Sequence, residues 1–181
     1  MPIWSEILNE IKKVTESGRS NSSDVVRRKY LAKLNKHTKR NTILYASAFT
    51  QNKPVDSALL SIVDEDIQGM MEVVSGLPKI NTDLIIHSPG GSAEASESII
   101  EYLHSQYPHI RVIVPHLALS AATMISCGGH EIVMGKHSFL GPIDPQIILY
   151  GPNGFTTNPA QAILDQFNLA IKEVIKAGGQ G

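Results

Sequence analysis

Twice in this chain a short apolar strand runs into a turn of small residues and then into a helix. The strand 83–87 leads into Ser88-Pro89-Gly90-Gly91-Ser92, and the strand 112–114 leads through Pro115 toward Ser120. Pro115 ends the second strand because proline cannot donate to a sheet ladder. Repeated strand-turn-helix units predict an α/β fold with a parallel sheet, and their turns are expected along one edge, where sites of such proteins form.

The other apolar patterns predict further elements of the same class. The predicted strands cover 43–49, 83–87, 112–114 and 131–134, and the predicted helices cover 22–37, about 67–74, 93–106, 120–127 and a last helix opening at Asn158-Pro159. Ser22 or Ser23 is a candidate cap of the first of these helices, and Asp64 of the second. At 181 residues the chain is long enough for a single layered domain. Periodicity alone does not distinguish a ββα spiral from a doubly wound sheet.

The N-terminal 21 residues predict a separate helical arm and hinge. Apolar residues recur at helical spacing from Ile3 to Val14, and Gly18 to Asn21 has the composition of a hinge. We expect the arm to pack on the body or on a neighbouring subunit. The segment 22–40 after it is the most positive part of the chain, which we interpret as a solvated helix face, with an acidic partner as the alternative.

Ser120 is the strongest candidate for chemistry. It stands at the mouth of a helix of small residues, where free N–H groups and the helix dipole favour an alkoxide. The alternative is a simple helix N-cap, which needs no chemistry. Gly90 and Gly91 suit either a tight turn or the close approach of a substrate backbone. A phosphate cradle is disfavoured because no Lys-Ser or Lys-Thr follows them.

Several motifs together resemble the serine dehydrogenase proteinase family of the Clp/crotonase superfamily, which also contains the Clp proteolytic subunit and signal peptide peptidase A. The resemblance rests on Ser88-Pro89-Gly90-Gly91, the serine turn at Ser120 and the segment 131–146, and extends over 27–175. It implies a Clp/crotonase-like ββα spiral, a single layered domain with an N-terminal helical arm. The expected organisation is an arm and hinge at 1–21, a serine peptidase domain at 22–177 and a tail at 178–181.

The resemblance also implies a catalytic arrangement. Ser120 would be the nucleophile, the N–H groups of Gly91 and Ala121 would bind the oxyanion, and Gly90 and Ser92 would contact substrate. The chain departs from the Clp triad, because ungapped matching puts Ile143-Asp144 where the Clp histidine lies. His137 and Asp144 are therefore the candidate bases or base partners. A lysine, or a residue of another subunit, is the alternative, although Lys172 and Lys176 are expected to be solvated.

Composition excludes other classes of function. Sixteen Lys and Arg against seventeen Asp and Glu give a net charge of −1, so no general field draws the chain to nucleic acid or to an anionic membrane. No apolar run long enough for a transmembrane segment and no signal-peptide pattern is present. The histidines lack paired metal-ligand spacing, and no metal or cofactor is expected. The single cysteine, Cys127, is expected to be buried and favours the reducing cytoplasm.

Three functions remain. The leading one is an ATP-independent serine peptidase that acts on a protein or peptide substrate through an acyl-enzyme on Ser120, as a homo-oligomer. The second is crotonase-type acyl-CoA chemistry, which needs a carboxylate such as Glu94, Glu97 or Asp144 near the site. The third is a non-catalytic oligomeric scaffold of the same fold.

Overall fold

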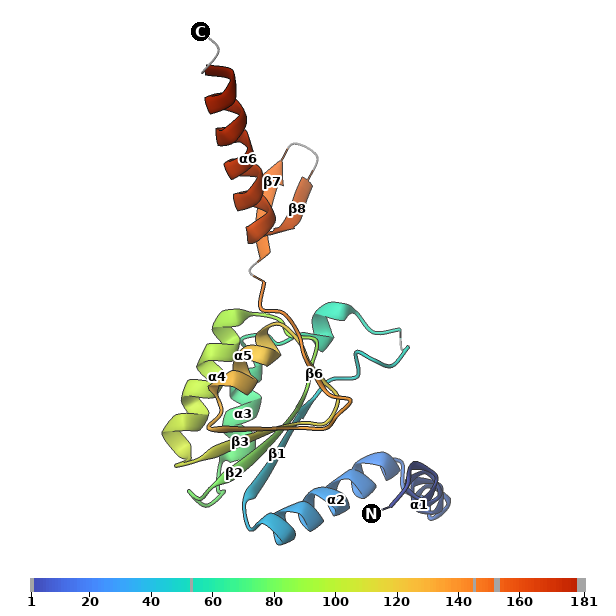
Figure 1. The fold of residues 1–181 in the computed structure, drawn as a ribbon. Helices are drawn as coiled ribbons and strands as arrows, with labels where there is room; N and C mark the ends of the chain where they lie inside the picture. The colour runs from blue at the N-terminus through green and yellow to red at the C-terminus, as the bar shows by residue number, and fades with distance from the viewer. Residues whose placement is uncertain (1, 53, 145, 152–153, 179–181) are drawn as a thin grey trace. The chain divides into compact units, whose positions relative to one another are not determined.

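The computed structural model describes residues 2–52, 54–144, 146–151 and 154–178 (Figure 1). They group into two compact units, and the border between them along the chain falls between Leu140 and Gly141. The predicted domain at 22–177 extends across this border, and its boundaries stay a prediction. Along the described chain, no helix combines the length and the apolar character needed to cross a membrane.

The first unit is built on a parallel four-stranded sheet in the order β1-β2-β3-β5. Its strands are β1 (Asn41–Ala46), β2 (Thr82–His87), β3 (Ile110–Val114) and β5 (Glu131–Met134). Ile43 pairs with Leu84, Leu84 with Val112, and Val112 with Ile132. The predicted α/β fold with a parallel sheet is confirmed. A parallel sheet of this kind is buried by the helices of its crossovers, which explains the apolar strands.

Helices α3 (Asp66–Val74), α4 (Ala93–Gln106) and α5 (Ala121–Gly128) pack beside the sheet (Figure 1). Ile99 and Leu103 of α4, Ile125 of α5 and Val112 of β3 are almost completely buried in the resulting core. The predicted helix at 93–106 has the observed bounds. It begins where predicted because the Ser92 hydroxyl accepts a hydrogen bond from the Ala95 amide. A short 3-10 helix, η1 (Ser57–Leu60), lies between β1 and α3.

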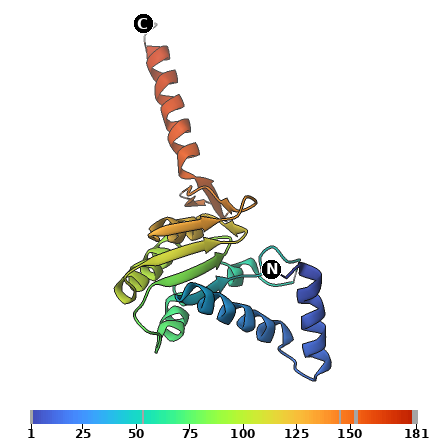
Figure 2. The same cartoon turned by 60° about the horizontal axis from the view of Figure 1, so that its bottom comes forward.

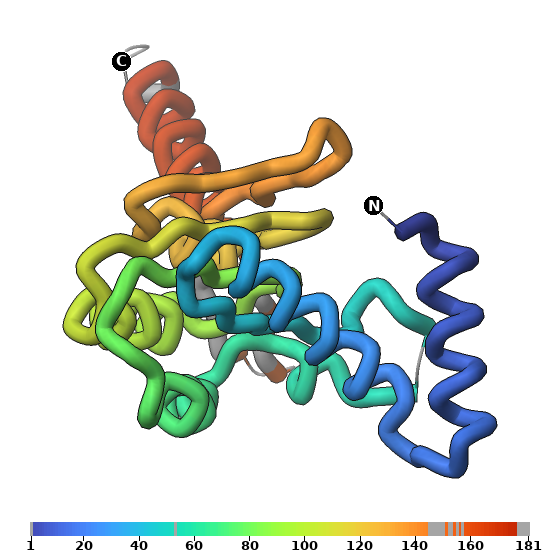
Figure 3. Tube along the Cα trace, turned by 90° about the horizontal axis from the view of Figure 1, so that it is seen from below, coloured from blue at the N-terminus to red at the C-terminus, as the bar shows by residue number. Residues whose placement is uncertain are grey.

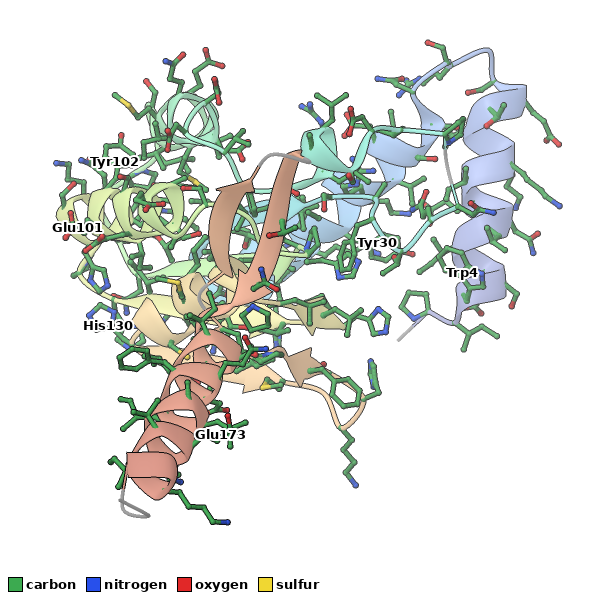
Figure 4. All side chains as sticks on the ribbon, turned by 90° about the horizontal axis from the view of Figure 1, so that it is seen from above. Trp4, Tyr30, Glu101, Tyr102, His130 and Glu173 are labelled. Carbon is green, nitrogen blue, oxygen red and sulfur yellow. The ribbon has the colours of Figure 1, made fainter. Side chains whose placement is uncertain are left out.

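Two helices precede the sheet, α1 (Trp4–Glu16) in the predicted arm and α2 (Ser22–Thr38) after it. They form a pair joined by a short turn (Figures 2 and 3). Glu10 of α1 accepts hydrogen bonds from Lys29 and from the Tyr30 hydroxyl of α2. Figure 4 shows Tyr30 on α2, and Trp4 at the start of α1, where 68% of its surface is exposed. Polar contacts therefore help to hold α1 against α2. The separate arm at 1–21 stays a prediction.

Three local predictions are wrong. The Ser22 hydroxyl does not cap α2, because it accepts a hydrogen bond from Thr15 of α1 instead. Asp64 does not cap α3. The N-cap residue of α3 is Glu65, and it makes no side-chain cap hydrogen bond. The carboxylate of Asp66, the first residue of α3, accepts from the Val63 amide before the helix and from the Tyr45 hydroxyl. Cys127 is exposed in this chain, since it lies on the side of α5 away from the core.

The second unit consists of an antiparallel hairpin, β7 (Gln146–Gly151) and β8 (Gly154–Pro159), and the helix α6 (Ala160–Gly178). The predicted opening of the last helix at Asn158-Pro159 is wrong by a short margin, because these residues complete β8. The hairpin was not predicted. Its sequence signal is Pro152-Asn153-Gly154, a turn-forming run between segments rich in β-branched and aromatic residues.

Candidate active site

Ser120 lies in a sharp turn between β4 (Leu117–Ala118) and α5, with φ 50° and ψ −122°. A residue with a side chain rarely adopts a positive φ, and strain of this kind costs about 1–3 kcal/mol. Local bonds hold the turn: the Thr123 amide donates to the Ser120 carbonyl (2.8 Å), and the Thr123 hydroxyl donates to the Ala118 carbonyl (2.8 Å). A strained serine between strand and helix is the geometry that presents a nucleophile in many hydrolases.

The side chain of Ser120 is not used to cap α5. It is half-buried, and its hydroxyl makes no hydrogen bond within the part of the chain that the structure describes. The alternative interpretation of Ser120 as a simple N-cap is therefore wrong, because a capping hydroxyl accepts from an amide of the first helical turn. The hydroxyl is free for another partner.

The glycine turn after β2 is held from two sides. The buried Ser88 hydroxyl accepts a hydrogen bond from the Gly90 amide (3.1 Å). On the other side, the Ile62 amide donates to the Gly90 carbonyl (2.8 Å), and the Ser92 amide donates to the Ile62 carbonyl (2.9 Å). These bonds form a parallel bridge between Ile62 and Gly91. Ile62 lies far from this turn in the sequence, so only the fold reveals that it positions the glycines.

The glycine turn and the serine turn lie against each other. The Ser88 amide donates to the Leu117 carbonyl (3.2 Å), and the Leu119 amide donates to the Ser88 carbonyl (3.1 Å). A Cβ atom built on Gly90 would lie 2.7 Å from the Cβ of Ser120 and 3.0 Å from the amide nitrogen of Ala121. Gly90 also has φ 97°, which favours glycine. The close approach of the two turns therefore depends on the missing side chain.

Two amides of these turns remain available as donors. The Ala121 amide is the first of α5 and has no acceptor within the helix, as expected at a helix start. The Gly91 amide also has no acceptor among the described residues, because the neighbouring groups Gly90 C=O and Ser92 N–H are the ones that pair with Ile62. In an extended segment, alternate residues direct their amides to opposite sides. Unpaired amides beside a free hydroxyl suit the binding of a developing oxyanion.

Residues 24–169 match the family of ClpP-like SDH-type serine proteinases. The chain belongs to this family. The predicted family is thereby confirmed. This ClpP-like chain is 37% identical over 107 residues to one uncharacterised protein of Methanocaldococcus jannaschii, and 39% identical over 90 residues to another. The matches cover 59% and 49% of the chain but 34% and 32% of the relatives, so the chain spans about a third of their length.

Solved ClpP structures are also similar. A mutant of ClpP1 from Listeria monocytogenes is 16% identical, with a TM-score of 0.39 and coverage of 79% of this chain and 69% of that one. The ClpP protease catalytic domain from Plasmodium falciparum is 23% identical, with a TM-score of 0.38 and coverage of 59% and 53%.

In this ClpP-like chain both the hydroxyl and the amide of Ser92 have partners at the start of α4 and on Ile62. Its hydroxyl accepts from the Ala95 amide (3.0 Å) and donates to the Glu94 carboxylate (3.0 Å), and its amide is bound to Ile62. The pKa of Glu94 is held below its ordinary value, first by a hydrogen bond from its own backbone and then by the hydrogen bond from the Ser92 hydroxyl. Ser92 thus shapes the start of α4, and a direct contact with substrate stays a prediction.

His137 is not brought to Ser120 within the chain. It lies in an exposed turn between β5 and β6 (Phe139–Leu140), and β6 runs parallel to β4 with Phe139 beside Leu117. His137 thus precedes the start of this ladder, whereas Ser120 follows its end. No hydrogen bond joins the two among the described residues. A role for His137 as base stays a prediction, and within one chain the register of β4 and β6 does not favour it.

Asp144 belongs to the second unit and is engaged in an interaction of its own. The structure therefore does not test whether it serves Ser120. Lys172 and Lys176 of α6 are exposed, as predicted.

His87 ends β2 just before the glycine turn. Its Nδ1 lies 3.2 Å from the Leu117 carbonyl oxygen, and its ring stacks on His116 with 5.6 Å between centroids. Burial lowers the pKa of His87, and the neighbouring His116 lowers it further. These contacts give His87 a structural role at the end of the strand, and the lowered pKa favours its neutral imidazole.

Proposed function

We propose that the chain is a serine peptidase that cleaves protein or peptide bonds through an acyl-enzyme on Ser120. The observation that carries the proposal is the strained Ser120, whose hydroxyl does not cap α5. It lies next to the amides of Gly91 and Ala121, which have no acceptor among the described residues. Ser120 would attack the scissile carbonyl, and the two amides would bind the oxyanion that forms. Losing one such donor typically costs about 3 kcal/mol of transition-state stabilisation.

The substrate would lie as an extended segment along the open side of Gly91. The side toward Ile62 is occupied by the parallel bridge, so the free N–H group of Gly91 faces the other way. A substrate strand added on this side would bring its scissile carbonyl group close to the Ala121 amide. The absence of a side chain on Gly90 lets the serine turn, with the Ala121 amide, lie close to this side.

The proton of Ser120 needs an acceptor. We propose that Asp144, His137 or a side chain of another subunit accepts it, and within one chain the register of β4 and β6 does not favour His137. A homo-oligomer is part of the proposal, since β5 exposes Ile132, Val133 and Met134 in a row on the edge of the sheet. Independence from ATP is also part of the proposal. Location in the cytoplasm stays a prediction.

A fluorophosphonate probe tests the nucleophile. We expect it to label the protein once, and we expect Ser120→Ala to abolish labelling. The matched control is Ser105→Ala, which removes an exposed hydroxyl from α4 that donates to the Tyr102 carbonyl and accepts from the neighbouring Gln106 side chain. Hydrolysis of a casein substrate with and without ATP then tests the reaction.

A folded protein that is not labelled contradicts the peptidase proposal. Binding of acyl-CoA would then point to crotonase chemistry, and its absence to a scaffold. No structural observation favours crotonase chemistry over the peptidase: Glu94, one of its candidate carboxylates, is bound to Ser92 at the start of α4.

A further inference from the structure

A basic concavity lies at the amino ends of β1, β2 and β3, the edge of the sheet opposite to Ser120. Its volume is about 750 Å³, within the usual range for small-molecule sites. The lining comes from the end of α2, from the residues just before β1, β2 and β3, and from Arg111 within β3. It consists of His37, Thr38, Lys39, Arg40, Lys79, Ile80, Asn81, Pro108 and Arg111.

Two arginines of the concavity are held in place by a buried carboxylate. Asp83 is completely buried, and it accepts hydrogen bonds from Arg40 Nε (2.6 Å), Arg111 Nε (3.0 Å) and Arg111 Nη2 (2.9 Å). Arg40 Nη2 also donates to the Thr82 carbonyl (3.3 Å). The side chains of Arg40 and Arg111 are 14% and 22% exposed. Both guanidinium groups are thus oriented in advance, which reduces the entropy lost on binding an anion.

These arginines keep donors for a further partner. The Nη1 atoms of Arg40 and Arg111 make no hydrogen bond to any described residue, and the same holds for the ammonium groups of Lys39 and Lys79. The lining carries four positive charges, those of Lys39, Arg40, Lys79 and Arg111. The carboxylates of Asp83 and of Glu131 on β5, which both interact electrostatically with Arg111, carry two negative charges, so the local net charge is +2. The whole chain has a net charge of −1, so this surface concentrates positive charge.

We propose that this concavity binds a small anion that carries two or three phosphate groups. Guanidinium groups bind phosphate oxygens in pairs, and lysines add flexible point charges. The lining includes no Phe, Tyr or Trp, so recognition rests on the phosphates and not on stacking of a base. A free polyphosphate anion and a phosphorylated lipid headgroup share this chemistry. The inference does not depend on the peptidase proposal.

Calorimetric titration of the full chain with inorganic tripolyphosphate at low ionic strength tests the site. The variant Lys39→Gly with Lys79→Ala removes the two unpaired ammonium groups and leaves the buried Asp83 cluster intact. Glycine suits position 39 because Lys39 has φ 56° at the end of α2. The matched control, Lys12→Ala with Lys13→Ala, removes the same charge from α1. A parallel arm measures binding to phosphatidylcholine vesicles that contain a phosphatidylinositol bisphosphate.

We expect saturable binding that weakens about tenfold for each lysine removed, about a hundredfold in the double variant, because each ammonium group would donate a charge-assisted hydrogen bond to phosphate. The control should bind like the wild type. Binding of tripolyphosphate identifies a free anion as the source, and binding of the vesicles alone identifies a headgroup. Absence of binding in both arms, or equal weakening in the control, overturns the proposal.

Discussion

The backbone of Gly90 touches the serine turn so closely that a Cβ atom on Gly90 would lie 2.7 Å from the Cβ of Ser120. The same atom would lie 2.5 Å from the Leu119 carbonyl oxygen, which is backbone and cannot move aside cheaply. The candidate oxyanion site therefore exists only because two turns that follow different strands meet without a side chain between them.

Gly90→Ala should remove activity. The added methyl group would stand 3.0 Å from the Ala121 amide and block the oxyanion, and φ 97° adds about 1–3 kcal/mol of strain. Fluorophosphonate labelling and thermal unfolding measure the two effects. The control is Gly69→Ala in α3, where an added Cβ atom would have no neighbouring atom within 4 Å. We expect this change to leave stability unaltered or slightly raised, because alanine favours the helix. Normal labelling of Gly90→Ala would contradict the proposed site.

Thr123→Val should weaken the serine turn. Valine keeps the shape of the buried side chain but leaves the Ala118 carbonyl without the threonine hydroxyl, at a cost of about 1–3 kcal/mol. Urea unfolding measures stability, and the labelling rate of Ser120 measures the turn. Thr123→Ser retains the hydroxyl and should recover most of that rate. Equal rates in all three proteins would show that this bond does not position Ser120.

Asp83→Asn should destabilise the first unit strongly. Removing one member of a buried ion pair leaves the other uncompensated, which costs about 3–5 kcal/mol. Asp24→Asn is the comparison: Asp24 pairs with Arg27 and Arg28 on the exposed face of α2, where an ion pair is worth about 0–1 kcal/mol. Urea unfolding of both variants should separate them clearly, and similar losses would argue against a structural role for the Asp83 cluster.

Acid should destabilise the protein partly through His87. Because burial lowers the pKa of His87 in the folded state, the unfolded chain binds the proton more readily. Stability is therefore complete above the unfolded pKa of about 6.5 and falls as the pH drops from there through the lowered folded pKa. His87→Gln should show a smaller decrease in thermal midpoint between pH 7 and pH 5. His137→Gln, on an exposed turn, should follow the wild type.

Val133→Lys should lower the molecular mass in solution. Val133 is 40% exposed on the edge strand β5, and a lysine there opposes association through this edge. Light scattering after size exclusion measures the mass. Val73→Lys places the same charge at an exposed site of α3 and serves as control. An unchanged mass for Val133→Lys would mean that the copies do not associate through β5.

The parts of the fold that sequence predicted well are those fixed by local pattern. The helix 93–106 and the strand 131–134 have the predicted bounds, because an N-cap serine starts the helix and a short apolar run delimits the strand. The hairpin of β7 and β8 was not predicted, because its short strands stand directly before α6, whose helical pattern is stronger than the turn signal. The exposure of Cys127 also escaped, since the small residues of α5 leave its two faces nearly alike in sequence.

The sequence by itself determined that a serine and a glycine pair follow successive strands of one parallel sheet, because strand periodicity, proline and glycine act over a few residues. Only the tertiary structure decided that Ile62 engages the groups on either side of Gly91, that Ser120 is held at a positive φ, and that the Gly91 and Ala121 amides stay unpaired. These features depend on hydrogen bonds between segments far apart in the chain, whose partners no local pattern specifies.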